Sequence, residues 1–116
     1  MDFALTEEQE SFRRAVKAFA EKEIAPIAAE SDETNMYPVE LLKQMADVGY
    51  LGIKFSSDYG GGDGGNLDAA LLFEELAAAS AGITLGVYCH VVLALTAIAR
   101  IGNEEQKQRY LAPGIR

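Results

Sequence analysis

The stretch that decides the fold is Ile83–Ile101, ITLGVYCHVVLALTAIARI, which carries no formal charge before Arg100. A surface helix shows a polar face with a period of about 3.6 residues, so a stretch that is apolar on every side must be surrounded by other helices or by lipid. His90, Thr84 and Thr96 place polar groups along it, and neither end carries the basic cluster or aromatic belt of a membrane span. The sequence therefore predicts the central helix of a soluble helical domain, with a membrane span as the disfavoured alternative.

Helix signals before this stretch predict two amphipathic helices. Thr6 and Gln9 form a Thr-x-x-Gln capping box for the first helix, which should kink or restart at Pro26 because proline removes a backbone donor. Pro38 suits the first turn of a second helix, which we expect to end at Gly49.

Two more helices flank the central one in the sequence. Asn66 is expected to cap the third helix, and Gly82 to end it. Gly102 should close the central helix, after which Asn103 repeats the capping pattern for a last helix. The apolar run Tyr50–Phe55 is too short to classify by period, and either a strand fragment or extended chain would fit.

Length and composition bound the fold class. At 116 residues, of which 49% are hydrophobic, the chain is long enough for one core and too short for two. We predict an all-α fold, an up-and-down bundle of about five helices around the central apolar helix from Ile83 to Ile101. The net charge of −8 would repel phosphate backbones and anionic lipid, so neither nucleic acid nor membrane is an expected partner. One cysteine and no signal-peptide pattern at the N-terminus favour a cytoplasmic location.

Two sequence patterns resemble functional sites. The glycines of the loop at 60–65 satisfy G-x-G-x-x-G, but Asp58, Asp63 and Asp68 surround the place of a pyrophosphate, so a connecting loop is the preferred interpretation. His90 and Cys89 are adjacent on a helix and point about 100° apart, so they cannot form a nucleophile–base pair. We expect a core or pocket-lining histidine bonded to backbone, no metal site and no complete catalytic site in this chain.

A series of short motifs resembles the N-terminal helical domain of acyl-CoA dehydrogenases. The order and spacing match along essentially the whole chain. The motifs are Leu5-Thr6-Glu7-Glu8-Gln9, Ala20-x-x-x-Ile24-Ala25-Pro26, Gly49-Tyr50-Leu51-Gly52-Ile53, Asp58-Tyr59-Gly60-Gly61, Glu74-Glu75-Leu76-Ala77 and Gly102-Asn103-Glu104-Glu105-Gln106-Lys107-x-x-Tyr110-Leu111.

The resemblance implies a flavoprotein that oxidises an acyl-CoA thioester between its α and β carbons. In that family a glutamate takes the α hydrogen as a proton and FAD takes the β hydrogen as hydride, and the electrons pass to an electron-transfer flavoprotein. Most FAD contacts and the catalytic carboxylate lie in a β domain and a second helical domain, which are absent from this chain. The resemblance also implies a homo-oligomer, a tetramer for the full-length enzyme.

What the resemblance leaves to this chain is a wall of the acyl pocket. Matched back from Gly102, the substrate-binding positions are Leu85, Gly86, Cys89 and Leu93, and their expected roles are steric. Residues 1–116 would then be one domain of a larger dehydrogenase, inactive alone. The alternative is a freestanding helical interaction module without catalysis.

Overall fold

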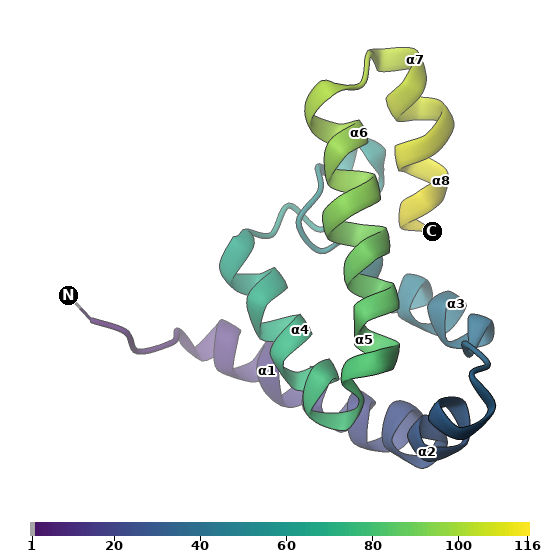
Figure 1. The fold of residues 1–116 in the computed structure, drawn as a ribbon. Helices are drawn as coiled ribbons and strands as arrows, with labels where there is room; N and C mark the ends of the chain where they lie inside the picture. The colour runs from purple at the N-terminus through teal and green to yellow at the C-terminus, as the bar shows by residue number, and fades with distance from the viewer. Residues whose placement is uncertain (1) are drawn as a thin grey trace.

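The computed structural model describes residues 2–116, and every regular element in that range is helical (Figure 1). The elements join into five continuous helices. The first comprises α1 (Glu7–Phe19), a π-helical segment (Ala20–Ile24) and α2 (Ala25–Thr34); the second is α3 (Val39–Asp47) and the third α4 (Asn66–Ala79). The central helix comprises α5 (Ala81–Tyr88), a π-helical segment (Cys89–Leu95) and α6 (Thr96–Ile101); the last comprises α7 (Glu104–Gln106), a π-helical segment (Lys107–Leu111) and α8 (Ala112–Ile115). The predicted all-α fold of about five helices is confirmed.

The helices form a flat molecule. In Figure 1, α1 and α2 lie along the base, α4 descends to them, the central helix rises again, and the α7–α8 helix returns beside α6. The principal extents are 41 × 40 × 22 Å. Because one helix with its side chains is about 10–12 Å across, the thinnest dimension holds about two helices. The central helix is therefore covered on one side and bare on the other.

The hydrophobic core lies where the central helix meets the other helices. Residues from the first helix, α3, α4, the central helix and the last helix share it. The largest side chains that are fully buried there are Val16, Ile24, Met45, Leu72, Leu76, Val87, Val91 and Leu111.

Local capping chemistry fixes two helix starts as predicted. Thr6 Oγ1 accepts the Gln9 N–H at 3.2 Å while Gln9 Oε1 accepts the Thr6 N–H at 2.9 Å. Asn103 and Gln106 repeat the reciprocal pair at 2.9 Å each. The predicted restart at Pro26 is confirmed: α2 begins at Ala25 after the π-helical segment, and Pro26 lies in its first turn, where the missing N–H costs little.

Several predicted boundaries are wrong by one to three residues. Gly65, rather than Asn66, caps α4, and its N–H donates to Asp68 Oδ2 at 2.7 Å. Ser80 ends α4 and caps α5, so the central helix begins at Ala81 and Gly82 lies inside it. The start is set by the Ser80 hydroxyl, which accepts the Ile83 N–H at 3.2 Å. Apolar content alone does not reveal this cap.

The segment after α3 is neither a strand nor extended. Gly49 adopts a left-handed conformation, with φ +83°, and the chain then forms a 3₁₀ turn over Tyr50–Gly52. The Tyr50 ring packs edge-on against Phe12 and Phe19, with centroid distances of 6.1 and 5.3 Å. This contact attaches the turn to α1.

The glycine-rich loop is held by its own backbone. Each N–H from residue 60 to residue 65 donates to an acceptor within the segment 52–68, and the bonds are 2.7–3.0 Å long. A Cβ on Gly61 would lie 2.1 Å from the Phe55 carbonyl oxygen, so glycine is required by close backbone approach. The loop is a packed structural element with no free donors for a phosphate.

An ion pair joins α1 to α4. Arg13 Nε donates to Glu75 Oε1 at 2.6 Å, and Glu75 is only 9% exposed. The Arg13 guanidinium also lies 3.7 Å from Glu74 Oε1. Both carboxylates therefore serve the α1–α4 contact and do not form an acid–base pair.

We predict that Gly61→Ala destabilises the protein by about 1–3 kcal/mol, because its Cβ meets backbone that cannot move without breaking the loop bonds. Gly82→Ala is the matched control: a Cβ there meets nothing within 4 Å and the position is helical. This control should be neutral or stabilising by about 0.4–1 kcal/mol. Urea unfolding monitored by circular dichroism measures both, and equal effects of the two changes would contradict the prediction.

Tyr59 ties the glycine-rich segment to α7. Its hydroxyl donates to the Glu104 carboxylate, at 3.0 Å from Oε1 and 2.8 Å from Oε2. This bond, with a smaller contribution from Gln108, lowers the pKa of Glu104 below its ordinary value of 4.5. A lowered native pKa contributes stability that is present above the ordinary value and is lost as the pH falls through the lowered one.

We therefore predict that Tyr59→Phe lowers the melting temperature at pH 7. The difference from wild type should shrink as the pH falls below about 4.5, because protonation of Glu104 weakens the bond in the wild-type protein. Thermal unfolding from pH 3 to pH 7 measures the difference. A constant difference over this range would contradict the assignment of the effect to the bond between the Tyr59 hydroxyl and the Glu104 carboxylate.

Candidate functional site

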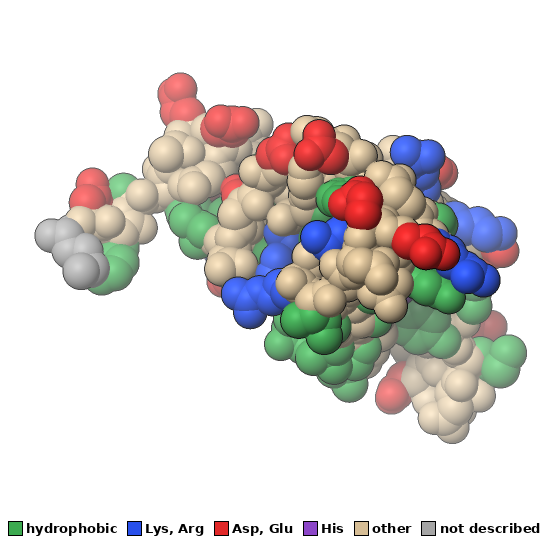
Figure 2. Space-filling view, turned by 90° about the horizontal axis from the view of Figure 1, so that it is seen from above, with side chains coloured by type: hydrophobic (Ala, Val, Ile, Leu, Met, Phe, Trp, Pro, Cys, Tyr) green, Lys and Arg blue, Asp and Glu red, His purple; other side chains and the backbone are tan. Residues whose placement is uncertain are grey.

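The bare side of the central helix carries a row of uncharged residues four positions apart. We call Leu85, Cys89, Leu93, Ala97 and Ile101 the apolar row; all five are exposed. Leu85 is 61% exposed, Leu93 58% and Ile101 86%. At about 1.5 Å per residue the row is roughly 24 Å long. Figure 2 shows hydrophobic side chains gathered on one side of the molecule, with the charged groups mostly outside that patch.

The π-helical segment keeps this row on one side. In an ideal α-helix, positions four apart drift by about 40°, so five such positions would wind about 160° around the axis. The wider turns over Cys89–Leu95 rotate less per residue and reduce that drift. Thr96 completes the segment, because its N–H and its Oγ1, at 2.9 Å, both donate to the Val91 carbonyl.

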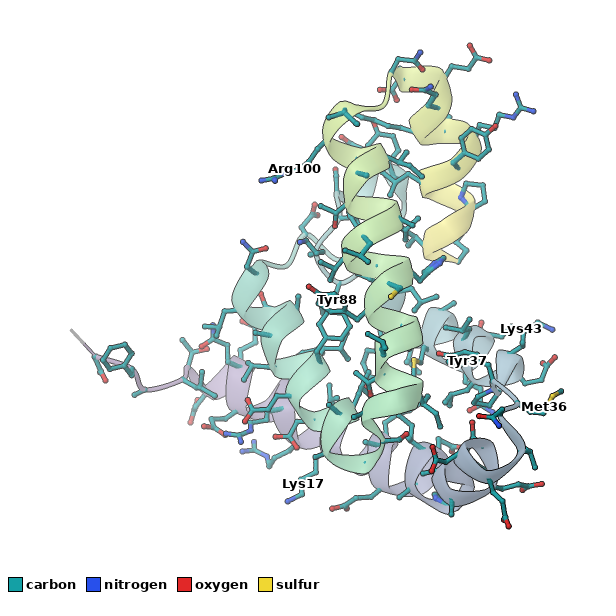
Figure 3. All side chains as sticks on the ribbon, viewed as in Figure 1. Lys17, Met36, Tyr37, Lys43, Tyr88 and Arg100 are labelled. Atoms are coloured by element: carbon teal, nitrogen blue, oxygen red, sulfur yellow. The ribbon has the colours of Figure 1, made fainter. Side chains whose placement is uncertain are left out.

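Aromatic side chains border the row on both flanks. Tyr88 packs edge-on against Phe73 of α4, with the ring centroids 5.4 Å apart. On the other flank Tyr37 lies beside Gly86, and its hydroxyl donates to the Ile83 carbonyl at 3.0 Å. Figure 3 shows Tyr37 and Tyr88 on opposite sides of α5. The N-terminal half of the row therefore lies between two aromatic side chains, Tyr37 and Tyr88.

Hollows lie near both ends of the row. One of about 330 Å³ lies between α6 and the last helix; Ala97, Ile98, Ile101 and Tyr110 line its apolar surface. Another of about 460 Å³ lies between α2 and the start of α5, and its lining is mixed: Ser31, Asp32, Asn35 and Ser80 are polar, whereas Ala28, Met36 and Ile83 are apolar. The α6 end of the row thus opens to an apolar space, whereas its α5 end lies near a space of mixed lining.

The row contains no acid–base machinery. Cys89 is exposed within it. His90 points away, and its Nε2 lies 2.7 Å from the Gly114 carbonyl oxygen, which confirms the predicted histidine bonded to backbone. Among residues 2–116, no three His, Cys, Asp or Glu side chains are placed to hold a metal ion. The arrangement can bind and desolvate an apolar ligand, but it holds no group placed to move a proton.

The structure brings three of the four predicted substrate-binding residues into one row. Leu85, Cys89 and Leu93 share it, whereas the space beside Gly86 is filled by the Tyr37 ring. Ala97 and Ile101 continue the row at the same four-residue spacing, which is visible in the sequence, but they were not among the predicted positions. No sequence signal linked Tyr37 to the central helix.

The helix Ala81–Ile101 is long and apolar enough to cross a membrane, and 28% of its most apolar window is buried. Its two sides differ, however. Val87, Val91 and Leu95 pack into the core, while the apolar row is exposed. Because one side of it packs against other helices, Ala81–Ile101 is consistent with a core helix. Its exposed side is then available to meet another surface.

Comparison with known proteins agrees with this architecture. Residues 6–116 match the model of the acyl-CoA dehydrogenase N-terminal domain. The chain is 45% identical over 113 residues to a short-chain-specific acyl-CoA dehydrogenase of Clostridium acetobutylicum, covering 97% of this chain and 30% of that protein.

Solved structures show the same fold. Butyryl-CoA dehydrogenase from Megasphaera elsdenii superposes with a TM-score of 0.89 at 36% identity, over 99% of this chain and 31% of the other. A chain in a structure reported for the electron transferring flavoprotein of Acidaminococcus fermentans gives a TM-score of 0.91 at 39% identity, over 97% of this chain and 30% of that one. The family is FAD-dependent, and relatives have been solved with FAD bound.

This chain thus spans about 30% of the length of the relatives it matches. Within that span the agreement covers all five helices and the short turns between them. The chain belongs to the acyl-CoA dehydrogenase family, as an N-terminal helical domain.

Proposed function

We propose that this domain forms one wall of the acyl pocket in an FAD-dependent acyl-CoA dehydrogenase. The observation that carries the proposal is the apolar row. It forms an uncharged strip roughly 24 Å long on a chain of net charge −8, and its two flanks carry aromatic side chains. Such a strip suits an alkyl chain, because each buried methylene contributes about 0.8 kcal/mol to binding.

Side chains of the row would select the substrate by size. Leu85 and Leu93 project from the exposed side of the helix, and Cys89 lies between them with a smaller side chain. An alkyl chain laid along the row would contact the two large leucine side chains and pass over the smaller cysteine. The length of the accepted acyl chain would then depend on the leucines and on the residues that close the pocket beside Gly86.

The glycine-rich loop at 60–65 does not offer a pyrophosphate site for FAD. A pyrophosphate needs free N–H donors, and every N–H of residues 60–65 is already paired within the loop. Asp58 and Asp63 add negative charge there. FAD and the catalytic carboxylate would therefore belong to parts of the enzyme outside this chain, namely a β domain and a second helical domain.

The remaining parts of the proposal follow from family membership. An acyl-CoA thioester is the substrate, an electron-transfer flavoprotein receives the electrons, and the full-length enzyme is a tetramer in the cytoplasm. The structure reported for an electron transferring flavoprotein, which contains a related chain, supports the choice of electron acceptor. The relation to a bacterial enzyme supports the location.

The proposal can be tested on the protein from its natural, uninterrupted reading frame. We expect an intact mass near three times that of this chain, and visible flavin absorbance that bleaches when a short acyl-CoA is added anaerobically. The bleaching reports reduction of the flavin by the substrate. Free coenzyme A, which lacks the acyl chain, is the control and should leave the spectrum unbleached.

The opposite result would favour the other candidate. A mass equal to that of this chain, with no visible absorbance, would contradict the dehydrogenase proposal. It would support a freestanding helical interaction module, in which the apolar row meets another protein.

Leu93→Phe in the full-length enzyme should shorten the longest acyl chain that is accepted. The larger ring would occupy space along the row, and one methylene in such a pocket changes kcat/KM by about tenfold or more. Leu67→Phe is the matched control, since Leu67 is a 48% exposed leucine on α4 outside the row. Steady-state kinetics with straight-chain acyl-CoA substrates measures the effect, and identical length profiles for both variants would contradict this placement.

A further inference from the structure

Tyr37 is fixed at both ends although it lies in a turn. The turn follows Asn35, which has a left-handed backbone with φ +55°, and Ser31 Oγ donates to the Met36 carbonyl at 2.8 Å. At the other end, the Tyr37 hydroxyl donates to the Ile83 carbonyl at 3.0 Å, across 46 residues of sequence. Burial raises the pKa of Tyr37, so the hydroxyl remains a protonated donor at neutral pH.

The Tyr37 ring fills the place of a missing side chain on the central helix. A Cβ added to Gly86 would lie 2.4 Å from Cε2, 2.6 Å from Cζ and 2.7 Å from Oη of Tyr37. Glycine is therefore required at position 86 to admit the ring. The ring stands directly against the helix, next to the positions of Leu85 and Cys89.

The same ring borders the 460 Å³ hollow. Tyr37 lines this space together with Ser31, Asp32, Asn35 and Ser80. These polar groups favour water in one part of the hollow, whereas apolar side chains such as Met36 and Ile83 line another part and suit an alkyl chain. Tyr37 thus stands between this hollow and the exposed side of the helix at Gly86.

We propose that Tyr37 is a specificity-determining residue that closes the α5 end of the acyl pocket and separates it from this hollow. The inference rests on the proposed function, because it assigns the blind end of that acyl site. With the ring in place, an alkyl chain that runs along the row stops beside Gly86. Without the ring, the notch at Gly86 opens into the hollow, and a longer chain gains room.

The test uses the full-length enzyme and three substitutions at one position. Tyr37→Ala removes the ring, Tyr37→Leu replaces it by a smaller apolar side chain, and Tyr37→Phe keeps the ring but loses the bond to the Ile83 carbonyl. kcat/KM is measured with saturated acyl-CoA substrates of increasing length and an artificial electron acceptor. Flavin content and melting temperature are recorded for each protein.

We expect Tyr37→Ala to raise kcat/KM about tenfold or more for chains just beyond the wild-type limit. Tyr37→Leu should give a smaller shift in the same direction. Tyr37→Phe should keep the wild-type length profile while lowering the melting temperature, because the ring remains and one partly buried hydrogen bond is lost. If Tyr37 had only a structural role, the variants would change stability without changing the length profile.

The inference is overturned if Tyr37→Ala or Tyr37→Leu retains flavin and activity with an unchanged length profile. If Tyr37→Ala does not fold, Tyr37→Leu alone decides the question. A wild-type enzyme that oxidises no acyl-CoA of any length would instead overturn the proposed function, and with it the assignment of Tyr37. The two failures are therefore distinguishable.

Discussion

The one-sided burial of the central helix is the constraint on which the rest of the structure depends. Val87, Val91 and Leu95 anchor one side of Ala81–Ile101 in the core, and the molecule is too thin, at 22 Å, to cover the other side as well. The surrounding contacts hold together the helices that cover the buried side. The Arg13–Glu75 ion pair joins α1 to α4, and the packed glycine loop connects the α3 region to α4. The other side of the helix is left uncovered.

Features with local chemistry could be predicted from the sequence. The capping boxes at Thr6 and Asn103 depend on residues three positions apart, so both helix starts were recognised. The end of the central helix before Gly102 was recognised as well. The predicted substrate-binding positions came from family resemblance, and the structure brings Leu85, Cys89 and Leu93 into one row.

Features that depend on distant contacts could not be predicted. The contact between Tyr37 and the central helix joins residues 46 positions apart, and nothing in the motif of either segment indicates it. The glycine loop resembled a connecting loop because most of its partners, backbone carbonyls between residues 52 and 57, carry no sequence signature. The π-helical turn at Cys89–Leu95 was missed for a similar reason, since apolar content is the same in both helix types.

The length of the π-helical segment determines which side chains of the central helix are exposed after it. Inserting or deleting one residue between Cys89 and Leu95 would rotate all following residues about the helix axis by about 100°. Ile101 and Ala97 would then turn away from the line of Leu85, while the buried face would lose Leu95. Relatives that vary in this segment are therefore expected to change by substitution and to conserve its length, because a single insertion would turn half of the helix by about 100° and carry Ala97 and Ile101 off the uncovered side.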